Sequence, residues 1–252
     1  MCNAVVVHSF SLPDLQIAEL IRKLLVEIQD FDPGSAQERN LIDPFATLLE
    51  SYAFEVDHMA WRASEHERLR QKNLMNKIGD IHQRIIGNLD GWTSYESGTE
   101  MPDGIGVRGR QKILLEVKNK HNTLNASSNV GTYKSLAEKL DEPRYAGYVG
   151  ILIGVLGPRE SRGKFWKPVS ATKCPKRNDL IVMNGRTFYA IATDPLMRQP
   201  VFDYGPTERL RTWSSWGAID LMVEQFVTAV GEIFGSEVPA WITDLFPQAL
   251  SD

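Results

Sequence analysis

Residues 102–120 read PDGIGVRGRQKILLEVKNK, and this stretch carries the clearest fold signal in the chain. The segments 103–107 and 112–120 have the composition of strands, and RGRQ at 108–111 joins them as the turn of a hairpin. Because successive side chains of a strand point to opposite faces, Glu116 and Lys118 share one face while Val117 packs toward the core. Two ionisable groups are therefore fixed at the end of an apolar strand, where unpaired charges would be costly.

An antiparallel hairpin brings Asp103 close to Glu116. The two carboxylates and the nearby main-chain carbonyl of Val117 are the hard oxygen ligands that Mg²⁺ prefers. The ion lowers the pKa of a water and neutralises charge on a phosphate oxygen. Lys118 can orient that water or stabilise the developing anion. The alternative is an exposed hairpin whose Glu–Lys pair is a surface ion pair worth about 0–1 kcal/mol.

Polar side chains follow this motif. They are Asn119, Lys120, His121, Asn122 and Thr123. Side chains of these types read base edges in the grooves of DNA, so we predict that they contact bases. The alternative is a polar loop that leads into the next helix.

A second polar region, residues 157–177, is strongly basic and contains one acidic residue, Glu160. Its basic residues are Arg159, Arg162, Lys164, Lys167, Lys173, Lys176 and Arg177. We predict that this loop contacts the phosphates of a duplex, in which case affinity falls steeply with salt. The alternative is a solvated loop without a ligand.

Charge is unevenly distributed along the 252 residues, whose net charge is −4. Residues 1–58 carry ten acidic and three basic side chains, and residues 217–252 carry six acidic and no basic ones. The middle of the chain therefore has a net charge of +9. Such a distribution suits a polyanion held in one cleft, although acidic, solvated helices at the ends would give the same numbers.

Cys2 and Cys174 have no metal or redox spacing, and the first ten residues lack the features of a secretion signal. The longest apolar run, 145–156, is too short to cross a bilayer. These features predict a cytoplasmic protein that does not interact with a membrane.

The hydrophobic periodicity predicts mostly helices first and a sheet later. Helices are expected over 15–28, 42–60 and 64–89, strands over 92–97, 103–107 and 112–120, and a helix over 127–142. A buried strand over 145–156, a hairpin over 179–193 around Asn184–Gly185 and a helix over 214–234 complete the chain. The predicted fold class is α/β (α+β), a mixed central sheet flanked by helices. A helical region, 1–90, precedes a core, 91–252, in one continuous domain.

The order Pro102-Asp103, twelve residues, then Glu116-x-Lys118, with a strand on each side and a helix after it, resembles the PD-(D/E)xK nuclease motif. Together with the helix KNLMNKIGDIHQRIIG at 72–87, residues 102–123 resemble type II restriction endonucleases of that superfamily. The likeness covers roughly residues 68–155 and is to the branch that cuts GGNCC/GGWCC-type sites.

This resemblance implies a restriction-endonuclease-like fold and Mg²⁺-dependent cleavage of double-stranded DNA by a homodimer, with a companion DNA methyltransferase. It implies that Asp103 and Glu116 are metal ligands and that Lys118 is the catalytic lysine. Some members add a glutamate from an upstream helix, and Glu55 or Glu67 is a candidate for that position. The apolar stripes of the N-terminal helices are candidates for the dimer interface.

Two other functions remain open. A structure-specific or repair nuclease of the same fold would read DNA shape and would have less need of base-reading side chains after the lysine. A non-catalytic DNA-binding module would bind in a salt-sensitive way without metal, but it would leave the grouped carboxylates and lysine without a use.

Overall fold

The structure, a computed structural model, describes residues 14–35, 42–95, 102–120, 126–156, 164–165, 174–193, 217–235 and 237–243. The chain divides into two compact units. One consists of Met1–Ile21 with His82–Asp252, and the other of Arg22–Ile81. The boundary therefore lies inside two helices, α1 (Asp14–Gln29) and α4 (His58–Gly87).

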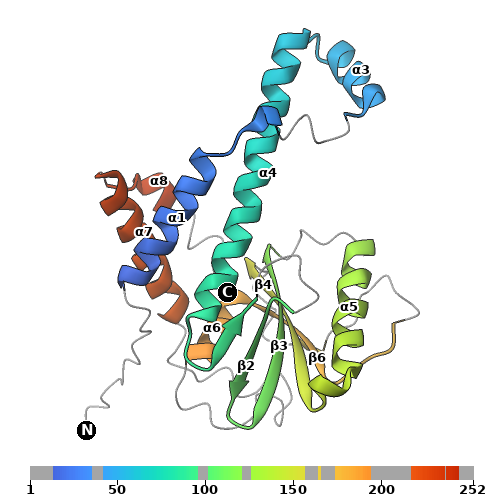
Figure 1. Cartoon of the computed structure of the whole chain (residues 1–252), viewed down its shortest axis with the longest axis vertical. Helices are drawn as coiled ribbons and strands as arrows, with labels where there is room; N and C mark the ends of the chain where they lie inside the picture. The colour runs from blue at the N-terminus through green and yellow to red at the C-terminus, as the bar shows by residue number, and fades with distance from the viewer. Residues whose placement is uncertain are drawn as a thin grey trace. The chain divides into compact units, whose positions relative to one another are not determined.

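The first unit contains a mixed sheet whose described strands lie in the order β1-β2-β3-β4-β6-β5 (Figure 1). The strands are β1 (Trp92–Ser94), β2 (Gly104–Arg108), β3 (Gln111–Lys120), β4 (Tyr148–Leu156), β5 (Lys164–Phe165) and β6 (Leu180–Asn184). β1, β2 and β3 are antiparallel neighbours, β3, β4 and β6 are parallel neighbours, and β5 pairs antiparallel with β6. The predicted mixed sheet flanked by helices is confirmed.

β3 lies inside this sheet, as its apolar sequence predicts. Ile113, Leu114 and Leu115 have no exposed surface, so the strand is covered on both faces. The predicted hairpin is also present, because Arg108 pairs with Gln111 and the turn between them includes Gly109 at φ 59°. Parallel pairing of β3 with β4 needs a crossover, and α5 (Ala126–Asp141) provides it.

Helices cover the two faces of the sheet. On one face Leu114, Leu152 and Leu180 pack with Tyr133 and Leu136 of α5. The single turn η2 (Pro143–Tyr145) follows α5 and leads into β4. On the other face the Trp92 ring lies against Gly106, where a Cβ would come within 2.1 Å of it. The ring of Trp92 also packs edge to face with that of Phe188 in α6 (Gly185–Thr193), with 5.1 Å between the ring centroids. The helices α7 (Gly217–Phe234) and α8 (Ala240–Thr243) complete the described chain.

The hairpin predicted over 179–193 is wrong. Residues 180–184 form β6 and residues 185–193 form α6. The Asn184 side chain accepts a hydrogen bond from the Thr187 N–H at 2.8 Å and so caps the helix. Gly185 is needed because a Cβ there would lie 2.6 Å from the carbonyl oxygen of Val155. The Asn–Gly pair therefore begins a helix here instead of forming a tight turn.

The second unit is helical, and two predicted helix boundaries in it are wrong. The run expected over 42–60 ends early, as α3 (Pro44–Ala53), and α4 begins at His58 rather than near residue 64. Asp57 caps α4 by accepting a hydrogen bond from the Ala60 N–H at 2.8 Å. Lys77 pairs with Glu27 at 2.5 Å within the unit. None of the helices described is long and apolar enough to cross a membrane.

Candidate active site

The β2–β3 hairpin places Asp103 beside the end of β3. Gly104 is paired with Leu115, so Asp103, one residue earlier, lies opposite Glu116. The N–H of Val117 donates a hydrogen bond to Oδ2 of Asp103 at 2.7 Å. The carboxylate is therefore held against the strand that carries the other two residues of the motif.

Glu116 and Lys118 lie on the same face of β3, as the period of a strand requires. Nζ of Lys118 is 2.7 Å from Oε1 of Glu116, and the two side chains are 33% and 22% exposed. The structure thus brings Asp103, Glu116 and Lys118 together at one place, half-buried but open to solvent.

Burial raises the pKa of Asp103 to about 6, and the nearby Glu116 carboxylate adds to this rise. The Val117 N–H and the positive charge of Lys118 act in the opposite direction. For Lys118, burial alone would lower the pKa, but the charge and hydrogen bond of Glu116 and the charge of Asp103 together outweigh burial, and the pKa is raised. Lys118 is therefore a cation at neutral pH.

One further residue near the site, Lys139, was not selected from the sequence. It lies near the end of α5, and its charge lowers the pKa of Asp103. No local pattern marks it, since α5 has two lysines, Lys134 and Lys139, and only the packing of α5 on the sheet determines which of them acts on Asp103. The order strand, helix, strand in the sequence, which indicates that the helix crosses the sheet, is the one signal that could have suggested a lysine of α5 near the site.

The oxygen ligands at this site fit Mg²⁺. Two carboxylates that face each other raise the pKa of Asp103, and a bound cation would relieve that repulsion. In the part of the chain that the structure describes, no group of three or more His, Cys, Asp or Glu side chains could hold a metal ion. Mg²⁺ commonly uses one or two carboxylates and keeps several waters, so the pair Asp103 and Glu116 is compatible with it, and the carbonyl of Val117 stays a predicted ligand.

The residues predicted to read bases begin at the end of β3. Asn119 is partly buried on the strand, and Lys120 is its last residue. His121, Asn122 and Thr123 lie outside the described residues, as does the side chain of Lys120. Base contact by all five residues stays a prediction.

The basic stretch 157–177 is described only in part. Arg159, Arg162, Lys167 and Lys173 lie outside the described residues, and of Lys164 only the backbone, in β5, is described. Lys176 is exposed. Contact of these residues with phosphate stays a prediction.

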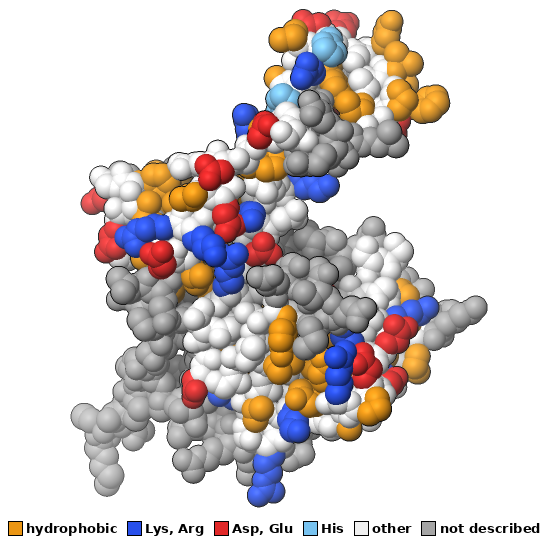
Figure 2. Space-filling model, in the orientation of Figure 1, with side chains coloured by type: hydrophobic (Ala, Val, Ile, Leu, Met, Phe, Trp, Pro, Cys, Tyr) orange, Lys and Arg blue, Asp and Glu red, His pale blue; other side chains and the backbone are white. Residues whose placement is uncertain are grey.

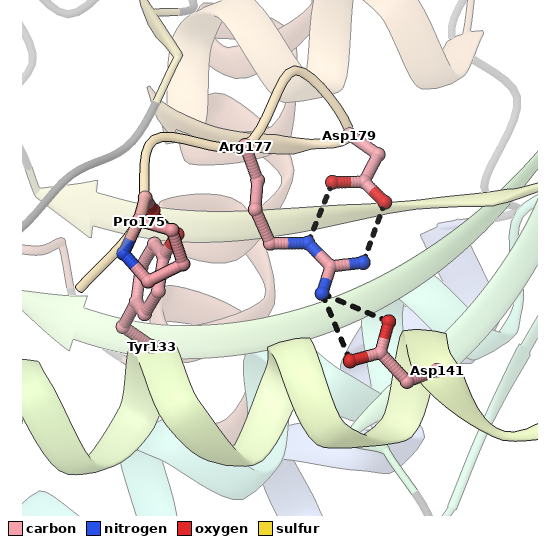
Figure 3. A network of polar contacts seen from close by, with 5 residues as sticks. All are labelled: Tyr133, Asp141, Pro175, Arg177 and Asp179. Carbon is pink, nitrogen blue, oxygen red and sulfur yellow. Dashed lines mark hydrogen bonds and ion pairs between the residues drawn. The ribbon is translucent and has the colours of Figure 1, made fainter.

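Arg177 joins the segment that precedes β6 to the end of α5 (Figure 3). Its guanidinium donates to Asp179 at 2.8 and 2.9 Å and to Asp141, the last residue of α5, at 2.9 and 3.0 Å. The bonds to Asp179 raise the pKa of Arg177 further above its usual range. Close by, the hydroxyl of Tyr133 donates to the carbonyl of Pro175. These contacts favour a structural role for Arg177, and its predicted phosphate contact stays untested.

Glu55 and Glu67, the candidates for an additional carboxylate, both belong to the second unit. Glu55 follows α3 with a φ of 54°, a value that non-glycine residues seldom adopt. Glu67 lies within α4, and its carboxylate is 3.7 Å from Arg70. Their predicted role at the active site stays a prediction.

Comparison with known proteins identifies relatives. The type II restriction enzyme Eco47II of Escherichia coli is 30% identical over 165 residues, which are 61% of this chain and 65% of that enzyme. The type II restriction enzyme Sau96I of Staphylococcus aureus is 29% identical over 102 residues, 40% of this chain and 36% of that enzyme. The matched region thus spans less than two thirds of either relative.

The family comparison covers more of the chain. A sequence model of the Eco47II restriction endonuclease family matches residues 14–197, a range that includes the whole β2–β3 hairpin and α5. The chain belongs to the Eco47II restriction endonuclease family.

Proposed function

We propose that this protein is a type II restriction endonuclease that hydrolyses phosphodiester bonds in both strands of DNA at a GGNCC/GGWCC-type site, with Mg²⁺ as cofactor. The observation that carries the proposal is the cluster of Asp103, Glu116 and Lys118 at the end of β3. Membership of the Eco47II family and similarity to two proteins named type II restriction enzymes support it.

The residues of the cluster share two tasks in this proposal. Asp103, Glu116 and the carbonyl of Val117 would hold Mg²⁺, which when bound would supply positive charge for the phosphate and acidify water. Asp103 has to be ionised for this task, as it is above pH 6. Lys118, fixed by its ion pair with Glu116, remains protonated and stabilises the negative charge that grows on the phosphate as the bond breaks.

The protein acts as a homodimer, because two copies related by a two-fold axis match a two-fold DNA site and cut one strand each. A companion DNA methyltransferase protects the host sites. Both proteins work in the cytoplasm, where the host DNA lies.

Digestion of a sequenced plasmid tests the proposal. We expect fragments of discrete size with Mg²⁺ and intact DNA with EDTA. Lys118→Met should abolish cutting with little effect on folding, because the side chain is one-third exposed. Lys112→Met is the matched control. Lys112 lies on the same strand, exposed and over the Tyr148 ring at the far end, and its loss should leave cutting intact.

The other functions give different results in the same assay. A smear, or cutting only at branched DNA, would favour a structure-specific or repair nuclease. Salt-sensitive DNA binding by the wild-type protein without any cutting, even with Mg²⁺ present, would identify a DNA-binding module. Either result would overturn the proposal of site-specific cleavage.

A further inference from the structure

Helix α3 turns its apolar side to solvent. Phe45, Leu48, Leu49 and Tyr52 follow one another at helical spacing and form one stripe. All four are exposed, whereas Thr47 and Ser51 are the least exposed residues of the helix. In a helix of a soluble monomer the polar side faces water and the apolar side is buried, so the orientation of α3 is the reverse of that expectation.

Neighbouring residues enlarge this stripe into what we call the α3 surface. Its members, with their exposed fractions, are Phe45 (78%), Leu48 (56%), Leu49 (70%), Tyr52 (80%), Phe54 (74%) and Met59 (73%). All six belong to the second unit. Figure 2 shows hydrophobic side chains gathered over α3.

α3 also has little to stabilise it within one chain. It has ten residues and none of them is buried. Isolated helices shorter than about 12–15 residues are marginal in water. Its N-cap, Asp43, and a hydrogen bond at 3.2 Å from the Trp61 indole N–H to Glu50 support it, but they bury none of its apolar face. The helix is therefore expected to pack against another surface.

The composition of the α3 surface matches the centre of a protein interface. Aromatic and methionine side chains are enriched there and charged ones depleted, and α3 carries one charged residue, Glu50. An apolar surface with an acidic residue is unsuited to a polyanion, so DNA is not the occupant.

The size of the surface matches a pair of identical chains. A large side chain offers about 150–250 Å² when fully exposed, so six at these fractions present roughly 650–1,100 Å². A stable interface buries about 800 Å² on each partner. Apolar stripes of this kind are self-complementary about a two-fold axis. We propose that the α3 surface is the interface through which two copies of this chain form a dimer.

This inference concerns the homodimer on which the proposed function rests, but its test does not depend on DNA cleavage. Sedimentation of the full-length protein over about 0.1–50 μM, a range suited to an interface of this size, should show the mass of two chains. Leu49→Glu with Tyr52→Glu should raise the dimer dissociation constant about 100-fold or more, because charges would enter an apolar interface. Val26→Glu, at an exposed apolar residue of the same unit, should not change it.

Hydrogen exchange of the unaltered protein provides a second measurement that needs no variant. Amides of residues 45–53 should exchange more slowly as the protein concentration rises through the dissociation constant. A wild-type monomer throughout the range would overturn the inference, as would a dimer unaffected by the double substitution. Slow exchange of the amides of 45–53 that does not depend on protein concentration would also overturn the inference, since another part of the chain or another protein would then cover α3. If the dimer behaves as expected but no DNA is cut, the proposed function alone fails.

Discussion

Asp103 has a carboxylate whose pKa is about 6 in the folded chain, compared with 3.8 for an unperturbed aspartate. Between these values the folded protein holds a proton that the unfolded chain has lost. The stability of the metal-free protein therefore falls as the pH rises from about 4 to about 6, and it remains lower at higher pH. Ionisation of Asp103 therefore destabilises the folded protein in the absence of metal.

Replacing Asp103 by Asn should remove this cost. In EDTA at pH 7 we expect Asp103→Asn to raise the free energy of unfolding by about 1–3 kcal/mol, and the gain should vanish at pH 4. Asp103→Ala should gain less, because the Val117 N–H would lose its acceptor. Urea unfolding at the two pH values measures this, and an Asn variant that is less stable than wild type at pH 7 would contradict it.

His82 titrates in the opposite sense. It is partly buried near the hydroxyl of Tyr189, with 3.5 Å between that oxygen and Nδ1, and burial lowers its pKa to about 4. The unfolded chain, with an ordinary histidine pKa near 6.5, takes up the proton first as the pH falls. Stability should therefore be lost between about pH 6.5 and pH 4, by up to about 1.4 kcal/mol per pH unit.

His82→Gln should remove this part of the acid sensitivity, whatever it does to stability at pH 7. The free energy of unfolding, measured by urea at several pH values from 7 down to 4, gives the slope for each protein. Equal slopes in the variant and the wild type would show that His82 is not the group that titrates.

At the scale of the element, β3 and its hairpin were predictable from the sequence and α6 was not. The β2–β3 pairing depends on residues close in sequence and on an apolar run that fits only a buried strand. Whether Asn184–Gly185 forms a turn or begins a helix depends on Val155, thirty residues away. The backbone of Val155 lies too close to Gly185 for any side chain at that position. Lys139 was missed for the same reason, because only the crossing of α5 brings it near Asp103.

Two glycine substitutions distinguish the effect of a distant contact on stability from the effect of local helix propensity. Gly185→Ala should destabilise the protein by about 1–3 kcal/mol or more, because the new Cβ would lie 2.6 Å from a backbone oxygen. Gly131→Ala is the matched change, since Gly131 lies inside α5 with no atom within 4 Å of the new Cβ. It should stabilise by about 0.5–1 kcal/mol through helix propensity. Thermal unfolding of both variants tests the contrast.

At the scale of the whole molecule, the uneven charge along the chain predicts strongly salt-dependent DNA binding. Neighbouring cations differ in what they contribute, because Lys176 is exposed whereas Arg177 is bound by Asp141 and Asp179. Lys176→Met should reduce the slope of log affinity against log salt by about 0.9. Arg177→Met should lower the melting temperature and leave the slope nearly unchanged.

Titration of labelled DNA in EDTA, in an Asp103→Asn background that prevents cutting, provides these slopes. If the slope falls as much in Arg177→Met as in Lys176→Met, Arg177 breaks its ion pairs with the two aspartates and contacts phosphate in the complex. The sequence-based assignment of Arg177 to DNA would then be correct despite its contacts in the free protein.

The discontinuous first unit has a consequence for biosynthesis. Ile17 and Ile21 leave the ribosome early, yet the rest of their unit begins at His82. At about 5–20 residues per second, the sixty intervening residues delay their burial by some 3–12 seconds. During that interval the nascent chain carries two isoleucines whose unit is still incomplete, so their burial has to wait for the synthesis of a later part of the chain.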